Sequence, residues 1–346
     1  MYVAPRPLVE DDPNLPARVA FMSAVGLLLG ILLRSPMTSI YASLTLSLTA
    51  GMRGQFNPGR AIGGPIAFAV AMWVMATVVI ITVPMPLVMS AVMALVYFLG
   101  FFMILRTGNP FGMLLVVGAA LCSILGAGSM VAMTLLRDEM TKAALITAAL
   151  LPVAYGLFPA KATWKDDPKY TPAPGGNFAL RAAIRAGVMV LYSVWLYAVM
   201  DTSNVMLAIG GMFILTFPTN REQFGEVFDR TYATVIGGVA GLLVLGFASL
   251  VGHLDVLVLV MFLTVFLFIA AMFTGKRPAM VYQYAASVVV TLVAGAFTMQ
   301  EPTFAFIQRV VLTFGGALVG AVITALLEAL LVKPERTEAP AAPATV

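Results

Sequence analysis

The amino-acid sequence predicts an all-α, polytopic membrane protein of about twelve transmembrane helices, arranged as two parallel six-helix repeats. The first observation behind this prediction is composition: 61% of the residues are hydrophobic, 10% are charged and the mean hydropathy is +0.98. Such a chain lacks the polar surface that a water-soluble particle of this size needs. The second is that apolar runs of about 20 residues, the length that crosses the hydrocarbon core of a bilayer, recur along the whole sequence. In hydrocarbon these runs are expected to be helical, because a helix satisfies its own backbone groups.

The third observation is an internal repeat with an offset of about 167 residues, as between Arg18 and Arg185. Arg53-x-Gln55-Phe56 returns as Arg221-x-Gln223-Phe224, and Lys142 has its counterpart in Arg309. Two copies that point the same way require an even number of spans in each half. In a bilayer, a duplication of this kind is typical of transporters and channels, whose polar path lies between the halves.

The predicted spans are 17–34, 37–52, 62–83, 86–105, 109–129, 142–160, 180–199, 203–219, 231–252, 255–274, 279–299 and 306–332. They divide the chain into an N-terminal cytoplasmic segment, a first repeat, a cytoplasmic linker, a second repeat and a disordered tail: 1–16, 17–160, 161–179, 180–333 and 334–346. The first 16 residues are polar and lead straight into a full-length span, so we expect no cleavable signal peptide.

The distribution of lysine and arginine predicts the orientation. Among these residues only Arg34, Arg137, Lys142 and Arg309 fall on the side opposite to the N-terminus. Cytoplasmic loops carry the excess of positive charge, so both termini are expected in the cytoplasm. This topology accounts for the net charge of +4 without nucleic-acid binding.

Several functional classes find no support in the sequence. It contains no G-x-x-x-x-G-K-[ST] phosphate loop, so this chain is not expected to hydrolyse ATP. A single histidine, His253, and a single cysteine, Cys122, give no metal-binding spacing. We therefore expect no enzyme activity, no cofactor and no metal site.

An arginine ahead of paired glycines occurs three times: Arg60-x-x-Gly63-Gly64, Arg230 with Gly237-Gly238-x-x-Gly241, and Arg309 before Gly315-Gly316-x-x-x-Gly320. With the six-span repeat, this pattern resembles the fusaric acid resistance and aromatic acid exporter superfamily, in its compact form without a large cytoplasmic domain. The resemblance implies export of small organic anions, typically aromatic carboxylates, across the bacterial inner membrane. It also implies a periplasmic membrane-fusion adaptor as partner. The glycines themselves are expected to be close-packing faces of helices, with a hinge as the alternative.

Two groups of residues are candidates for substrate binding. Lys142 and Arg309 are cations just inside the sixth span of each half, where they would suit a carboxylate; the alternatives are snorkelling to lipid phosphates or pairing with Asp138, Glu139 or Glu301. The eleventh span carries Tyr282, Gln283 and Tyr284, whereas the matching segment of the first half is apolar. Gln283 could bond a carboxylate or hydroxyl and a tyrosine could stack on an aromatic ring, unless these side chains only join helices.

Other charged residues are candidates for coupling or gating. Arg34 and Asp201 occupy corresponding outer positions and could form an ion pair that opens during transport, or each could be solvated. Asp201 is also a candidate proton acceptor. Arg53 and Arg221 lie in cytoplasmic loops, as anchors or as part of a substrate entry.

These features together predict a secondary efflux transporter for organic anions, powered by the proton gradient. A passive anion channel and a non-transporting scaffold for an envelope partner remain alternatives. A homo-oligomer in membrane lipid is compatible with all three.

Overall fold

The computed structural model describes residues 7–10, 12–161, 170, 172, 177–198, 210–211, 213–298 and 301–332, and all regular structure within them is helical. The α-helices are α1 Leu15–Leu32, α2 Thr38–Gly51, α3 Pro58–Thr82, α4 Pro86–Thr107, α5 Pro110–Gly128, α6 Met130–Leu157, α7 Phe178–Ala198, α9 Asn220–Val251, α10 Leu254–Thr274, α11 Ala279–Gly295 and α12 Pro302–Leu331. Residues 210–211 and 213–215 are also helical. Within the described ranges, nine helices are long and apolar enough to cross a membrane. The prediction of an all-α, multi-pass membrane protein is therefore confirmed.

Local sequence explains where the helices begin and end. Asn57 accepts a hydrogen bond from the backbone of Arg60 and precedes Pro58, a residue suited to the first turn of α3. Ser129 caps α6 in the same way, directly after the end of α5. Gly108 ends α4 in the left-handed conformation that glycine adopts without strain.

Two helices begin well before their predicted spans. α6 starts at Met130 and not near 142, and α9 starts at Asn220 and not near 231. A capping box between Thr219 and Glu222 fixes the start of α9. Hydropathy detects only the apolar part of a helix, so the charged turns that precede it were missed. As a result, charged residues expected in loops, among them Arg137 and Arg230, lie on helices.

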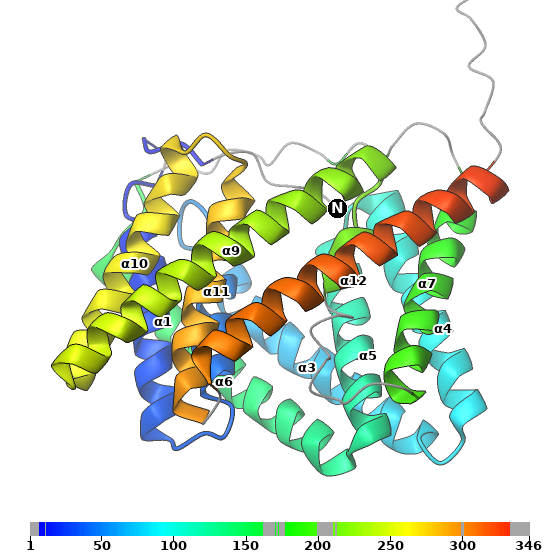
Figure 1. The fold of residues 1–346 in the computed structure, drawn as a ribbon, viewed down its shortest axis with the longest axis horizontal. Helices are drawn as coiled ribbons and strands as arrows, with labels where there is room; N and C mark the ends of the chain where they lie inside the picture. The colour runs from blue at the N-terminus through cyan, green and yellow to red at the C-terminus, as the bar shows by residue number, and fades with distance from the viewer. Residues whose placement is uncertain are drawn as a thin grey trace, which may run out of the picture.

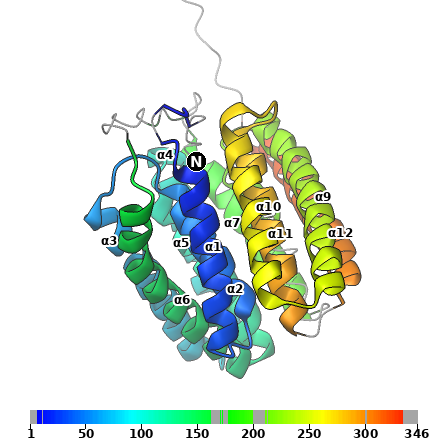
Figure 2. The same ribbon diagram turned by 90° about the vertical axis from the view of Figure 1, so that its left-hand side faces the viewer.

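The helices pack in matching pairs (Figures 1 and 2). α3 lies against α6 and α9 against α12; α4 lies against α5 and α10 against α11. Contacts between distant parts of the chain are equally regular, because α1 packs on α10 and α4 packs on α7. One hydrophobic core joins α3, α4 and α5 to α7, and another joins α1 and α2 to α10 and α11. Each large core therefore combines both halves of the chain.

Two buried arginines hold one end of the bundle. Arg18 forms an ion pair with Asp12, donates to the Phe158 carbonyl and lies over the Tyr155 ring. Arg185 pairs with Glu328 at 3.3 Å and donates to the Pro218 carbonyl. Both arginines are 0% exposed. A buried cation is tolerated only with such partners, so these contacts fix the positions of helix ends that are far apart in the sequence.

The close packing predicted for the glycines is found at Gly237, Gly238 and Gly241 of the second half, but not at Gly315 of that half or at Gly63 of the first. A Cβ at Gly237 would overlap the backbone of Ala285, so the absence of a side chain lets α9 approach α11. The close packing predicted at Gly63 is not found, because no described residue comes within 4 Å of a Cβ there.

Candidate functional site

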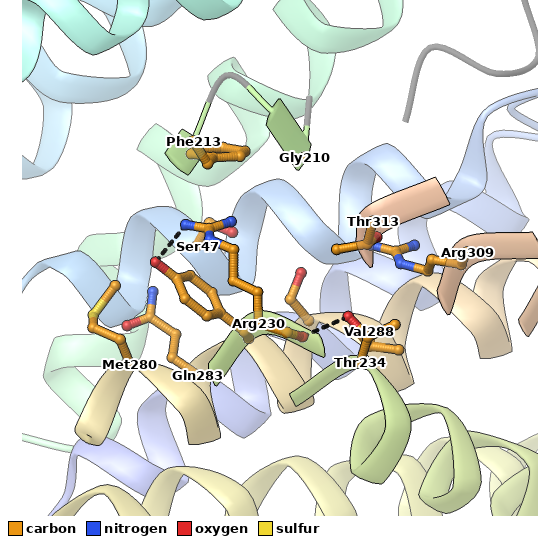
Figure 3. Close-up of a pocket in the computed structure, with 12 residues that line it drawn as sticks. Ser47, Gly210, Phe213, Arg230, Thr234, Met280, Gln283, Val288, Arg309 and Thr313 are labelled. Atoms are coloured by element: carbon orange, nitrogen blue, oxygen red, sulfur yellow. Dashed lines mark hydrogen bonds between the residues drawn. The ribbon is translucent and has the colours of Figure 1, made fainter. Parts of the chain in front are cut away.

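A cavity of about 320 Å³ lies between the helices of the second half, with one wall from α2 (Figure 3). It is large enough for a molecule the size of a single-ring acid. Its wall consists of polar and apolar side chains from α2, α9, α11, α12 and the helical residues around 210–215: Ser47, Gly210, Phe213, Arg230, Thr234, Met280, Gln283, Tyr284, Ser287, Val288, Arg309 and Thr313.

Helical periodicity places these side chains on common faces. On α11, Met280, Gln283, Tyr284 and Ser287 occupy positions i, i+3, i+4 and i+7, which lie on one face of a helix. On α9 and α12 the lining residues are four apart, Arg230 with Thr234 and Arg309 with Thr313. In Figure 3, Gln283 and Met280 lie at one side of the cavity and Arg309 and Thr313 at the other.

Arg230 is held by three neighbours, Glu226, Tyr284 and Phe213. Its Nε donates to Oε1 of Glu226 at 2.7 Å, and its Nη2 donates to the Tyr284 hydroxyl at 2.7 Å. The guanidinium carbon lies 4.1 Å from the centroid of the Tyr284 ring and 4.4 Å from that of Phe213. Two aromatic faces thus sandwich the cation, a favourable arrangement because the ring faces carry negative partial charge.

Arg309 has a different environment. Its Nη1 donates to Oγ1 of Thr291 at 2.7 Å. No ion pair joins it to a carboxylate in the described part of the chain. A partly buried cation in a cavity wall without an anionic neighbour is suited to hold an anion from solution.

The structure brings together three of the predicted substrate-binding residues, Gln283, Tyr284 and Arg309. Tyr282 does not line the cavity, because its hydroxyl accepts a hydrogen bond from the backbone of Arg277 at the turn between α10 and α11. Lys142 also lies elsewhere: its Nζ is 2.7 Å from Oε1 of Glu139, and its side chain is 60% exposed. The pairing with Glu139, considered above as an alternative for Lys142, is the arrangement found.

The predicted coupling and gating residues that the structure describes, Arg34, Arg53 and Arg221, do not line the cavity. Arg34 is exposed after α1 with a φ of 49°. Arg53 lies between α2 and α3, and Arg221 is the exposed second residue of α9. Asp201 lies outside the described residues, so its predicted pairing with Arg34 is untested.

Sequence analysis missed Arg230, Phe213, Thr234 and Ser47 as cavity residues. Arg230 was noted only for its place before a glycine pair. A signal was available, because Glu226 and Arg230 are four residues apart, the spacing of an ion pair on one helix face. The described residues contain no cluster of three side chains that could hold a metal ion.

Helices long and apolar enough to cross a membrane, around a cavity with two arginines, are compatible with a protein of the membrane-transporter type. Comparison with known families agrees: residues 189–323 match the family described as fusaric acid resistance protein-like. The matched range contains every residue of the cavity wall except Ser47. The resemblance inferred from the arginine and glycine motifs is therefore confirmed. No curated protein and no solved structure matches the chain.

Proposed function

We propose that this protein is a secondary exporter of small organic anions, foremost aromatic carboxylates, in the bacterial inner membrane, and that the cavity is its substrate site. The observation that carries the proposal is Arg309, a cation in the cavity wall that pairs with no carboxylate of the described chain. A carboxylate would bind there through charge-assisted hydrogen bonds, with the hydroxyl of Thr313 beside it.

The remaining wall suits the rest of an aromatic acid. Phe213 and Tyr284 offer ring surface for stacking. Gln283 forms no hydrogen bond to a described residue, so its amide is available to a hydroxyl or carboxylate of the substrate.

The proposed architecture is two six-helix repeats with both termini in the cytoplasm. The recurrence of helix pairs supports it, since α3 with α6 corresponds to α9 with α12, and α1 with α10 corresponds to α7 with α4. The arginine and lysine bias supports the orientation. A periplasmic membrane-fusion adaptor would continue the path of the substrate.

The proton gradient is the proposed energy source, because the sequence has no phosphate-binding loop for ATP. A passive anion channel is the second candidate, and one observation favours it: none of the residues in the described cavity wall is acidic. In vesicles, uphill export that stops when a protonophore collapses the pH gradient would support the exporter. Currents that reverse at the anion equilibrium potential and ignore pH would support the channel.

Transport of benzoate and of neutral benzamide by Arg309→Gln vesicles tests the site itself. We expect benzoate transport to fall about tenfold or more, since a hydrogen bond to a charged group contributes about 1.5 to 3 kcal/mol, and benzamide to change little. Lys142→Gln is the matched control, because it removes the corresponding cation of the first half, which already pairs with Glu139. Equal losses for both compounds, or equal losses in both variants, would contradict the proposed site.

A further inference from the structure

The cavity has one carboxylate behind its wall. Glu226 lies on α9 one turn before Arg230, is partly buried with 11% of its side chain exposed, and accepts the Nε hydrogen of Arg230. Arg309 has no such neighbour among the described carboxylates. The two cavity arginines therefore differ in a way that affects their affinity for a further anion. Arg230 already pairs with a carboxylate of the protein, whereas Arg309 pairs with none of the described carboxylates.

The geometry around Arg230 limits how a second anion can reach it. Phe213 and Tyr284 cover the two faces of the guanidinium, so access is at its edges. A bidentate carboxylate takes two parallel N–H donors. Glu226 occupies Nε and the Tyr284 hydroxyl occupies Nη2, while Nη1 makes no hydrogen bond to a described residue. An incoming carboxylate can begin at Nη1, but it gains a full bidentate contact only by competing with these neighbours.

The two arginines also lie at different depths. Arg185 bonds both the Pro218 carbonyl, just before α9, and Glu328, near the end of α12, so these helix ends lie together. Measured from that end at 1.5 Å per residue, Arg230 lies about 15 Å along α9 and Arg309 about 33 Å along α12. An anion that crosses the cavity would meet Arg230 and Arg309 one after the other.

We propose that Glu226 is the resident counter-ion of Arg230 and competes with the substrate anion for it. The substrate displaces Glu226 on arrival, and Glu226 returns to Arg230 as the substrate moves on to Arg309. This exchange prevents Arg230 from holding the substrate anion too tightly, because the Glu226 carboxylate takes the place of the substrate carboxylate as the substrate leaves. Glu226 is thus a positioning residue that sets affinity and release; the inference rests on the proposed function only for the identity of the anion.

The test measures binding of carboxylate anions to the purified full-length protein. Sodium formate or sodium benzoate is added, and binding is detected as a shift in the thermal unfolding temperature. Glu226→Gln should bind these carboxylates about tenfold more tightly than the wild type, the factor expected when a competing charged hydrogen bond is removed. In transport, the same variant should show a lower KM and a lower kcat. Asp229→Asn is the matched control: it removes one negative charge from the same helix, three residues on, where Asp229 faces Arg277 at 3.9 Å and is not part of the wall of this cavity.

Each outcome decides the proposal. Weaker binding in Glu226→Gln, comparable with that of Arg230→Gln, would overturn it, because Glu226 would then orient Arg230 for the substrate. If Glu226→Gln does not fold, Glu226→Asp replaces it: tighter binding than the wild type supports the exchange and weaker binding refutes it. Tighter binding by Glu226→Gln together with no wild-type transport of carboxylates would keep this inference and reject the proposed export.

Discussion

At the scale of single residues, the position of Gln283 favours a role in binding a ligand over a role in joining two helices. It lies on the cavity face of α11 and bonds no other described residue. The alternative that it joins two helices by a hydrogen bond therefore finds no partner in the described part of the chain. What remains is an amide directed at a space that a ligand can fill.

Gln283→Leu should therefore leave the protein inserted and weaken substrate binding. Leucine favours membrane insertion. A substrate group that loses its hydrogen-bond partner costs about 1 to 3 kcal/mol, or roughly 5- to 150-fold in affinity. Benzoate and 4-hydroxybenzoate affinities, measured on protein of matched expression, check this. Unchanged affinities would remove Gln283 from the site.

Glu328 is a second residue whose loss should be severe. It is the carboxylate partner of the fully buried Arg185. Glu328→Gln should lower the free energy of unfolding by about 3 to 5 kcal/mol, because it leaves a buried charge unpaired. Unfolding in mixed detergent micelles measures this change. The double variant Arg185→Leu, Glu328→Leu should recover part of the loss, and a double variant as unstable as the single one would refute the pairing argument.

Much of the cavity could be predicted from single residues, and the rest could not. Gln283, Tyr284 and Arg309 stood out because polar or charged groups are rare in apolar spans and tend to be functional. Arg230 and Phe213 did not, since their role depends on a contact between α9 and residues that the sequence places 17 positions away. Tyr282 is the same residue type as Tyr284, yet its position two residues earlier on α11 turns it toward Gly275.

At the scale of helices, the close approach of α9 and α11 depends on Gly237. α9 also carries Gly246, where a Cβ would meet no described atom within 4 Å. The two glycines lie on the same helix and differ only in what faces them. They make a matched pair for testing close packing.

Gly237→Ala should destabilise the protein by about 1 to 3 kcal/mol, the usual cost of an extra methyl group in a packed interface. It should also reduce transport, because Tyr284 and Gln283 precede Ala285 on the displaced segment of α11. Gly246→Ala should change neither property. Thermal unfolding and benzoate transport of the two variants are the measurements, and equal behaviour of the pair would contradict close packing at Gly237.

At the scale of helices, the apolar runs in the sequence predicted where the described helices lie, but they did not predict where α6 and α9 begin. The turn at Pro84 and Pro86 separates α3 from α4 as predicted. The early starts of α6 and α9 depend on capping by Ser129 and Thr219, which a hydropathy pattern does not register. The N-terminal parts of these helices, which the predicted spans left out, carry Glu139, Glu226 and Arg230.

At the scale of the whole molecule, orientation is the property to test first. Single cysteines at Lys276 and His253, in a Cys122→Ala background, lie at exposed turns at opposite ends of α10. In intact cells we expect a membrane-impermeant thiol reagent to label the cysteine at 253 and to spare the cysteine at 276. The reverse pattern would invert the proposed topology, and labelling of both would break it.

The repeat in the sequence did not predict how the two halves of the chain meet. The sequence suggested two separate bundles with a path between them. In the structure, α7 completes the core of α3, α4 and α5, and α1 and α2 complete that of α10 and α11. No local sequence pattern predicts this packing of helices from one half against the other, because an apolar helix face does not specify which other apolar face it will contact. The cavity follows the same rule, since Ser47 of α2 closes a wall built by the second half.

The two buried arginines also differ in when they can be paired during synthesis. Arg18 has its partner Asp12 six residues away, so that pair can form as soon as α1 leaves the ribosome. Arg185 must wait for Glu328, which is 143 residues downstream. At roughly 5 to 20 residues per second, that interval is about 7 to 30 s. During this time a lone arginine makes α7 costly to bury in lipid. α7 is therefore expected to stay at the membrane surface or beside the insertion machinery until α12 emerges. It would reach its final position in the bundle only after α12, which is synthesised after all the other described helices.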